Sequence, residues 1–146
     1  MPVILITGAA GRIGSMLRPR LAQPGRTLRL LDSARIEPGP GEEAIQASAT
    51  DLEAMTRACR GVDAVIHLAA QAGEAPWGRI LKVNIHGSYV AFEAARRAAV
   101  PRVIFASSNH VVGYAPRSEF PVPDYALPAP DTYYGVSKAK IGRAHV

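Results

Sequence analysis

Short runs rich in apolar residues recur along the chain and alternate with segments of helical periodicity. The runs at 3–6, 27–31, 64–67 and 102–106 are rich in β-branched and aliphatic residues, and a weaker run lies at 44–47. Runs of this length are typical of strands that are buried on both faces of a parallel sheet. The pattern therefore predicts five strands.

The first interval between these runs has the spacing of an amphipathic helix. Ile13, Leu17 and Leu21 recur every four residues and predict one apolar stripe. Pro19 lies past the first turn of this helix, where proline removes a backbone hydrogen bond and costs about 3 kcal/mol. We therefore expect a kink at Pro19 or an early end to the helix.

Two more helices are predicted at 51–59 and 79–99, the second with Val83, Val90 and Ala94 on one stripe. Strand and helix then alternate throughout. This order predicts right-handed crossovers and a doubly wound parallel α/β sheet, in which ligands bind beyond the carboxyl ends of the strands.

Composition fits one globular domain. The chain has 146 residues, of which 48% are hydrophobic and 20% are charged. The lone Cys59 and the lack of a signal-like leader favour a reducing cytoplasm, and no apolar run approaches the roughly 20 residues that span a bilayer. The net charge of +5 comes mainly from scattered arginines, so we expect no nucleic-acid partner and no membrane partner. No metal site is expected.

The segments 37–43 and 114–132 are rich in proline and predict surface loops, of which the longer could fold over a site.

The stretch TGAAGRIG places Gly8, Gly11 and Gly14 between the first strand and the first helix. Glycines there permit a tight turn and close approach of a pyrophosphate to the amino terminus of the helix. Asp32 ends the second strand and can accept hydrogen bonds from the ribose hydroxyls of an adenosine, while its charge would repel a 2′-phosphate. NAD is therefore favoured over NADP, although Arg35 could neutralise such a phosphate.

Tyr134 and Lys138 are spaced one helical turn apart, so both project from one face of a helix. A phenol with a pKa near 10 is a poor base at neutral pH, but a neighbouring ammonium and a nicotinamide cation favour the phenolate. The pair is a candidate device for proton transfer.

These motifs occur in one order together with DAVIHLAA at 63–70, VNIHG at 83–87, SSNHVVGY at 107–114 and YGVSK at 134–138. Over residues 2–139 the chain resembles the extended short-chain dehydrogenase/reductases, also called the NAD-dependent epimerase/dehydratase family, and within it the uronate dehydrogenases. The resemblance implies a Rossmann-type fold and a cytoplasmic oxidoreductase that uses NAD.

The resemblance also implies site roles. Tyr134 would be the general acid or base, with Lys138 lowering its pKa and holding the nicotinamide ribose, and Ser108 would bind the reacting hydroxyl. The substrate would also be bound by Asn109 and His110. The cofactor would be bound at its pyrophosphate by Gly8, Gly11, Arg12, Ile13 and Gly14, at its adenosine ribose by Asp32, at its adenine by Asp51 and Leu52, and along its nicotinamide half by Leu68, Ala69 and Ala70, with Asn84 beneath the site.

The substrate is expected to be a small sugar or sugar acid. A uronate dehydrogenase would oxidise the anomeric carbon of a hexuronic acid to a lactone. Ala72 departs from that pattern, because the uronate dehydrogenases tend to carry serine there. A nucleotide-sugar epimerase or dehydratase and a non-catalytic NAD-sensing module remain alternatives. His67 is expected to pack at a strand end, and Trp77 either packs or lines the substrate pocket.

In the family that the chain resembles, the helix begun at Tyr134 continues, a sixth strand follows, and a smaller region binds the substrate. We expect residues 1–140 to be an incomplete NAD-binding domain, truncated after the fifth strand and the start of this helix. The hexapeptide 141–146 equals the translation of a common sequencing adapter, so we expect it to be non-native, with Lys140 also in doubt. The fragment alone is expected to be poorly soluble and inactive, and the full-length protein to be a homodimer.

Overall fold

The centre of the molecule is a sheet of five parallel strands. In the computed structural model, which describes residues 1–139, the strands have the order β3-β2-β1-β4-β5. They are β1 (Val3–Thr7), β2 (Thr27–Asp32), β3 (Glu42–Gln46), β4 (Ala64–His67) and β5 (Val103–Phe105). The expected Rossmann-type doubly wound sheet is confirmed. The expectations for Lys140 and for 141–146 lie outside the described residues.

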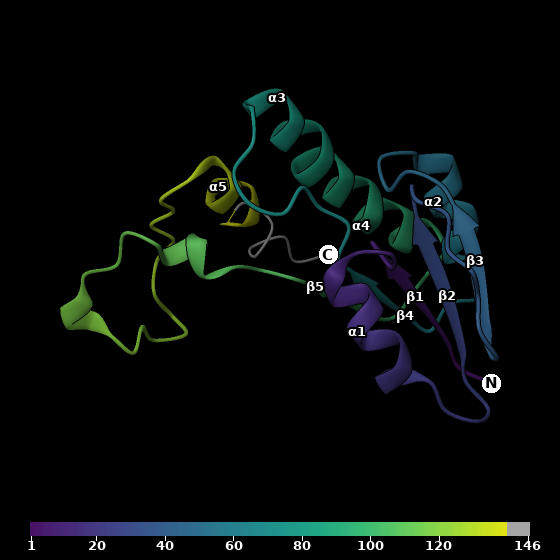
Figure 1. Ribbon diagram of the computed structural model, residues 1–146. Helices are drawn as coiled ribbons and strands as arrows, with labels where there is room; N and C mark the ends of the chain where they lie inside the picture. Colours follow the sequence, from purple (N-terminus) through teal and green to yellow (C-terminus); the bar gives the residue numbers. More distant parts are fainter. Residues whose placement is uncertain (140–146) are drawn as a thin grey trace.

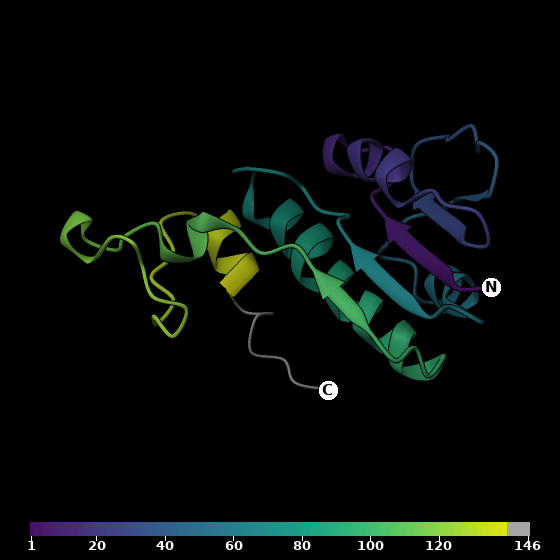
Figure 2. The same cartoon turned by 90° about the horizontal axis from the view of Figure 1, so that it is seen from below.

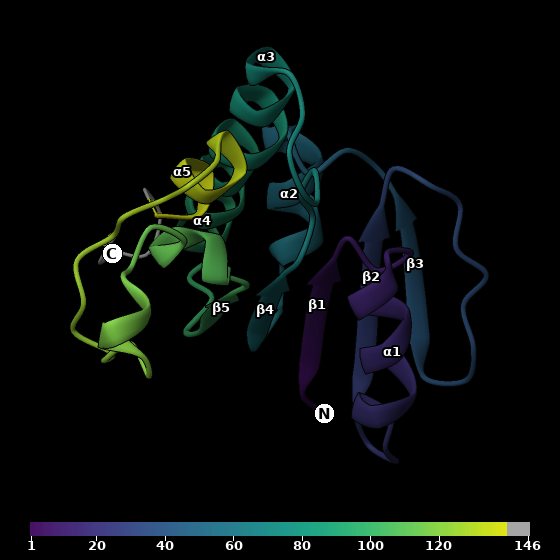
Figure 3. The same cartoon turned by 60° about the vertical axis from the view of Figure 1, so that its left-hand side comes forward.

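Helices cover both faces of this sheet (Figure 1, Figure 3). α1 (Arg12–Leu21) lies on one face, and α2 (Leu52–Cys59) and α4 (Gly87–Arg97) lie on the other. The chain leaves β1 toward β2 and later returns to place β4 on the other side of β1. The strand order therefore reverses between β1 and β4, and the carboxyl ends of these strands are where a ligand site is expected in such a sheet.

The core consists of two apolar clusters, one on each face of the sheet. Leu5 packs with Met55 and Val90 toward α2 and α4, whereas its neighbour Ile6 packs with Leu28 and Leu30 on the opposite side. Successive strand side chains point to opposite faces. Both faces are covered, which explains the continuous apolar run at residues 3–6 of β1.

The first helix departs from expectation. α1 runs two residues beyond Pro19 and ends at Leu21. Because the helix ends at Leu21, the missing N–H of Pro19 removes only one backbone hydrogen bond, near the end of the helix. In the same turn, the Arg20 guanidinium donates to the carbonyl oxygen of Met16 at 2.6 Å. Ile13, expected on the buried stripe, is 56% exposed.

The long helix also differs in detail. It begins at α3 (Trp77–Ile80), continues through the π-helical η1 (Leu81–His86), and ends with α4 at Arg97. Figure 1 shows these three segments as one rod. The sequence predicted neither the earlier start nor the π-helical turns. β3 likewise begins inside the segment predicted as a loop.

Beyond β5 the chain forms the short 3₁₀ helices η2 (Asn109–Val112) and η3 (Arg117–Glu119) and then α5 (Tyr133–Ala139). The segment between η2 and α5 extends away from the sheet (Figure 2). Its base is closed by two backbone hydrogen bonds, from Tyr114 N to Ala129 O at 3.0 Å and from Ala129 N to Val111 O at 2.8 Å. Within 1–139, no helix is both long and apolar enough to cross a membrane.

Candidate active site

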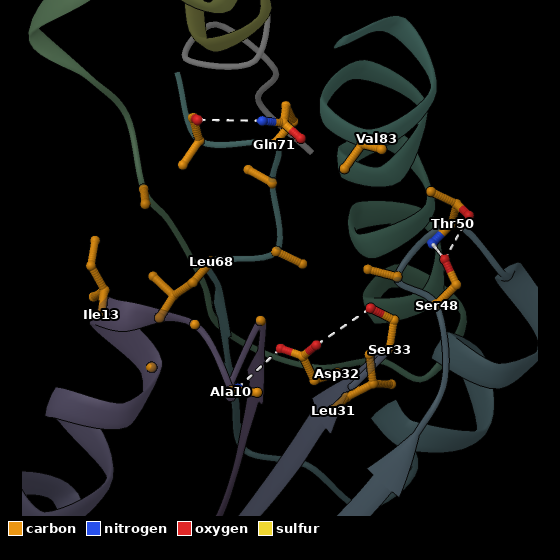
Figure 4. A pocket seen from close by; sticks show the side chains of 18 of the residues that line it. Ala10, Ile13, Leu31, Asp32, Ser33, Ser48, Thr50, Leu68, Gln71 and Val83 are labelled. Atoms are coloured by element: carbon orange, nitrogen blue, oxygen red, sulfur yellow. Dashed lines mark hydrogen bonds between the residues drawn. The ribbon is translucent and has the colours of Figure 1, made fainter. Parts of the chain in front are cut away.

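A cleft of about 760 Å³ lies at the carboxyl ends of the strands. Figure 4 shows its side chains converging from the glycine turn, the end of β2 and the segment after β4. Its lining residues come from every element at this edge: Gly8, Ala10–Gly14, Leu31–Ala34, Ser48–Thr50, Leu68–Ala72, Arg79, Lys82, Val83, Ala106, Ser107, Tyr134 and Lys138. The glycine turn and the Tyr134–Lys138 pair therefore share one cavity.

The glycine turn is packed too tightly for larger residues. Gly8 has a φ of +69°, and a Cβ added there would lie 2.7 Å from the backbone nitrogen of Ala69. A Cβ on Gly14 would lie 2.5 Å from the carbonyl oxygen of Gly8. The turn therefore packs closely against the segment after β4. The amino terminus of α1 lines the cleft, where backbone N–H groups favour an anion.

Asp32 fixes the other side of the turn. Its Oδ2 accepts a hydrogen bond from Ala10 N at 3.0 Å, and its Oδ1 accepts one from Ala34 N at 3.0 Å. Ser33 Oγ also donates to Oδ1 at 3.4 Å, and Figure 4 shows the carboxylate among the residues that line the cleft. Arg35 forms an ion pair with Glu37 at 2.8 Å, is 81% exposed, and lies outside the cleft lining formed by the described residues.

Lys138 is buried beside Tyr134 on α5. Its side chain is 4% exposed, and its Nζ lies 4.6 Å from the ring centroid of Phe105 and 5.8 Å from that of Tyr134. Burial lowers the pKa of Lys138 to about 8. The ammonium thus lies close to two aromatic rings, and Lys138 lines the cleft.

Contacts at both sides position the start of α5. Tyr134 N donates to Glu74 Oε2 at 3.0 Å, which satisfies one of the free N–H groups of the helix. A Cβ on Gly135 would collide with the carbonyl oxygen of His110. α5 therefore packs directly on η2.

Asn84 lies buried beneath the site, in the π-helical η1. Its Oδ1 accepts from Gln71 N at 2.7 Å, and its Nδ2 donates to Ser137 Oγ at 3.0 Å. Ser137 Oγ in turn donates to Tyr134 O at 2.7 Å. Asn84 therefore connects the segment after β4 to the first turn of α5.

His67 is buried at the end of β4, as its expected packing role requires. Its Nδ1 lies 2.8 Å from Thr7 Oγ1, and its ring stacks on Phe105. Burial, with a smaller effect of the Lys138 charge, lowers the pKa of His67 to about 4. It is neutral near pH 7. Trp77 contacts Tyr133 with ring centroids 5.4 Å apart and lies outside the cleft lining in 1–139.

Several expected site residues lie beside the cleft instead of lining it. Asp51 caps α2, with its Oδ1 accepting from Ala54 N at 3.0 Å, and Leu52 begins that helix. Ser48–Thr50, which the sequence reasoning missed, supply that part of the wall; their place just after β3 was the available signal. Ser108, Asn109 and His110 lie next to α5, and Ser107 takes the lining position. In residues 1–139, no group of three or more His, Cys, Asp or Glu side chains could hold a metal ion.

A glycine turn at the switch point of a parallel sheet, an acidic residue ending β2, and a Tyr-Lys pair in the same cleft are typical of a Rossmann-type dinucleotide-binding domain. The chain belongs to the NAD dependent epimerase/dehydratase family, whose model matches residues 4–144.

Its relatives include uronate dehydrogenases. The chain is 43% identical over 138 residues to the uronate dehydrogenase of Pseudomonas syringae pv. tomato, covering 93% of this chain and 50% of that protein. It is 45% identical over 140 residues to the one from Agrobacterium fabrum, covering 94% and 52%. A crystal structure of uronate dehydrogenase from Agrobacterium tumefaciens, a tyrosine-to-alanine mutant complexed with NAD, superimposes with a TM-score of 0.88 at 42% identity and covers 94% and 52% of the two chains. The chain thus spans about half the length of the curated relatives it matches.

Proposed function

We propose that the protein is an NAD-dependent oxidoreductase that oxidises the anomeric carbon of a hexuronic acid to a lactone. The observation that carries this proposal is the single cleft shared by the glycine turn, Asp32 and the Tyr134–Lys138 pair. The similarity to uronate dehydrogenases supports the substrate class. When bound, NAD would accept the hydride from the anomeric carbon.

The cleft fits a dinucleotide, since its lining joins the glycine turn and the amino terminus of α1 to Asp32 and to the Tyr134–Lys138 pair. The pyrophosphate would rest on the amino terminus of α1, and Asp32 would bind the adenosine ribose. Arg35 forms an ion pair with Glu37, which supports NAD over NADP as the cofactor. The remaining binding residues would be those proposed from the sequence: Gly11, Arg12, Ile13, Gly14, Asp51, Leu52, Leu68, Ala69 and Ala70, with Asn84 as support.

Tyr134 would take the proton of the anomeric hydroxyl as its general base. The Lys138 ammonium would stabilise the phenolate, and it would also bind the nicotinamide ribose. Ser108 would hydrogen-bond the reacting hydroxyl, and Asn109 and His110 would bind further hydroxyls of the ring. A pKa of about 8 keeps most of Lys138 charged at neutral pH, as this role requires.

The assay uses the extended protein, defined as the chain continued past residue 139 by its source DNA to the length of its relatives. NAD is supplied with glucuronate or with galacturonate, and NADH is followed by absorbance. Turnover with either acid supports the proposal. Turnover of a nucleotide sugar without net NADH, and none with the acids, would assign the protein to the epimerases instead. The same DNA tests whether 141–146 is adapter sequence.

We also propose that the extended protein is a cytoplasmic homodimer. Exposed apolar and aromatic side chains gather on the long helix and at the start of α5, namely Trp77, Leu81, Tyr89 and Tyr133. Covering them against a second copy would remove apolar surface from water. Sedimentation equilibrium of the extended protein tests this assembly, and a monomer at micromolar concentration would contradict it.

A further inference from the structure

Asp131 and His110 form a hydrogen-bonded pair next to Tyr134. Asp131 Oδ1 lies 2.8 Å from His110 Nδ1. The imidazole meets the Tyr134 ring edge to face, with centroids 5.9 Å apart and an interplanar angle of 79°. None of the sequence motifs pointed to Asp131, which lies two residues before α5.

The surroundings of Asp131 leave its carboxylate little freedom. Thr132 Oγ1 donates to the same Oδ1 at 3.3 Å. On the other side, a Cβ added to Gly113 would collide with the carboxylate. The hydrogen bond from His110 is the main cause that lowers the pKa of Asp131, so the group is an ionised acceptor at neutral pH. The pair is therefore held in place by the loop after η2 and by the residue before α5.

This contact determines which ring nitrogen carries the proton. An ionised carboxylate can only accept hydrogen bonds, so His110 Nδ1 must be the protonated nitrogen. In the neutral imidazole, Nε2 then has a bare lone pair and acts as an acceptor. Among residues 1–139, no donor forms a hydrogen bond with this nitrogen.

We propose that Asp131 is a positioning residue that holds His110 as the Nδ1–H tautomer, so that Nε2 accepts a hydrogen bond from a sugar hydroxyl. This inference rests on the proposed function for the identity of the substrate. An acceptor at Nε2 requires a sugar hydroxyl that can donate a hydrogen bond. This requirement distinguishes a free ring hydroxyl from a methylated or deoxygenated position. Because η2 packs on α5, the same contact keeps this acceptor in register with Tyr134.

The direct test is ¹⁵N NMR of the extended protein labelled at histidine, well above the usual histidine pKa of about 6.5. His110→Gln assigns the signal. We expect a protonated Nδ1 and an unprotonated Nε2 in the wild type, and a shift toward the Nε2–H tautomer in Asp131→Ala. Asp131→Asn should keep the wild-type tautomer, because Thr132 favours an oxygen at the Oδ1 position. A wild type with Nε2–H, or a tautomer unchanged in Asp131→Ala, would overturn the proposal.

Kinetics provide a second measurement. Asp131→Ala should raise KM for the uronic acid about tenfold, the effect of one hydrogen bond of about 1.4 kcal/mol, with NAD affinity unchanged. Asp131→Asn should stay within about threefold of wild type. Asp124→Ala, an exposed aspartate of the same loop, is the matched control. Equal KM in Asp131→Ala and wild type would also overturn the proposal. If the wild type turns over no uronic acid, the proposed substrate fails, while the tautomer measurement still decides the role of Asp131.

Discussion

The ammonium of Lys138 lies 4.6 Å above the ring of Phe105, so the last described helix places a cation directly on the aromatic face of β5. The negative face of the ring compensates for part of the lost hydration. The rest of that cost appears as a pKa lowered to about 8. This burial connects the proposed catalytic lysine to the stability of the fold.

In the extended protein, Lys138→Met should reduce the increase in the free energy of unfolding that occurs as pH rises from about 8 to 10.5. The folded-state pKa of about 8 lies below the ordinary value of 10.5, so between these values the unfolded chain binds a proton that the folded chain does not. Stability from this group therefore increases as pH rises from about 8 to 10.5, and the cost of its burial is complete below pH 8. Urea unfolding across this range measures the effect. Lys82→Met, an exposed lysine of η1, serves as control and should leave the slope unchanged.

Tyr134→Phe in the extended protein should reduce turnover by about 10² to 10⁴ and leave NAD affinity almost unchanged, since only the acid–base hydroxyl is lost. The chain offers a close control. Tyr133→Phe alters the neighbouring tyrosine, which contacts Trp77 and lies outside the cleft lining in 1–139, and should retain activity. Comparable losses in both variants would remove Tyr134 from its proposed role.

Asp32→Asn should relax the preference for NAD. The amide retains one oxygen that can accept from Ala10 N, so the glycine turn keeps that hydrogen bond, while the bond from Ala34 N and the charge near the ribose are lost. Loss of that repulsion should raise the NADP to NAD ratio of kcat/KM by about tenfold, or about 1.4 kcal/mol. Asp63→Asn, whose carboxylate accepts from Val3 N at the opposite end of β1, should leave the ratio unchanged. Equal use of both cofactors by the wild type would contradict the proposed preference and would indicate that Arg35 offsets the repulsion from Asp32.

A structural feature can be predicted from the sequence when it depends on residues that are close together in the chain. The central strands were predictable because both faces of the sheet are covered, so residues 3–6 and 64–66 are apolar without interruption. The glycine turn and the Tyr134–Lys138 pair were predictable because each motif is a short continuous segment. The strand order explains why both motifs line the same cavity.

Other features depend on contacts between distant segments. The π-helical turns contain Asn84, whose hydrogen-bond partners Gln71 and Ser137 come from two other segments. The spacing of apolar residues does not predict such hydrogen bonds. The pair of His110 and Asp131 joins residues that are 21 positions apart across an irregular loop. Ile13 satisfies the helical stripe yet faces the cleft, because a stripe predicts an apolar contact without saying whether protein or ligand provides it.

Gly8→Ala should be much more disruptive than Gly25→Ala, although both glycines have positive φ. At Gly25, with a φ of +79°, an added Cβ meets nothing within 4 Å, so the variant bears only the backbone strain of about 1 kcal/mol. At Gly8, with a φ of +69°, the Cβ would also lie 2.7 Å from Ala69 N, and displacing that backbone should bring the total to roughly 2–4 kcal/mol. Urea unfolding of the two variants of the extended protein separates the terms, and NAD titration should show loss of binding in Gly8→Ala alone. Equal destabilisation in both variants would mean that strain, and not the close approach of the turn to the segment after β4, is what requires glycine at this position.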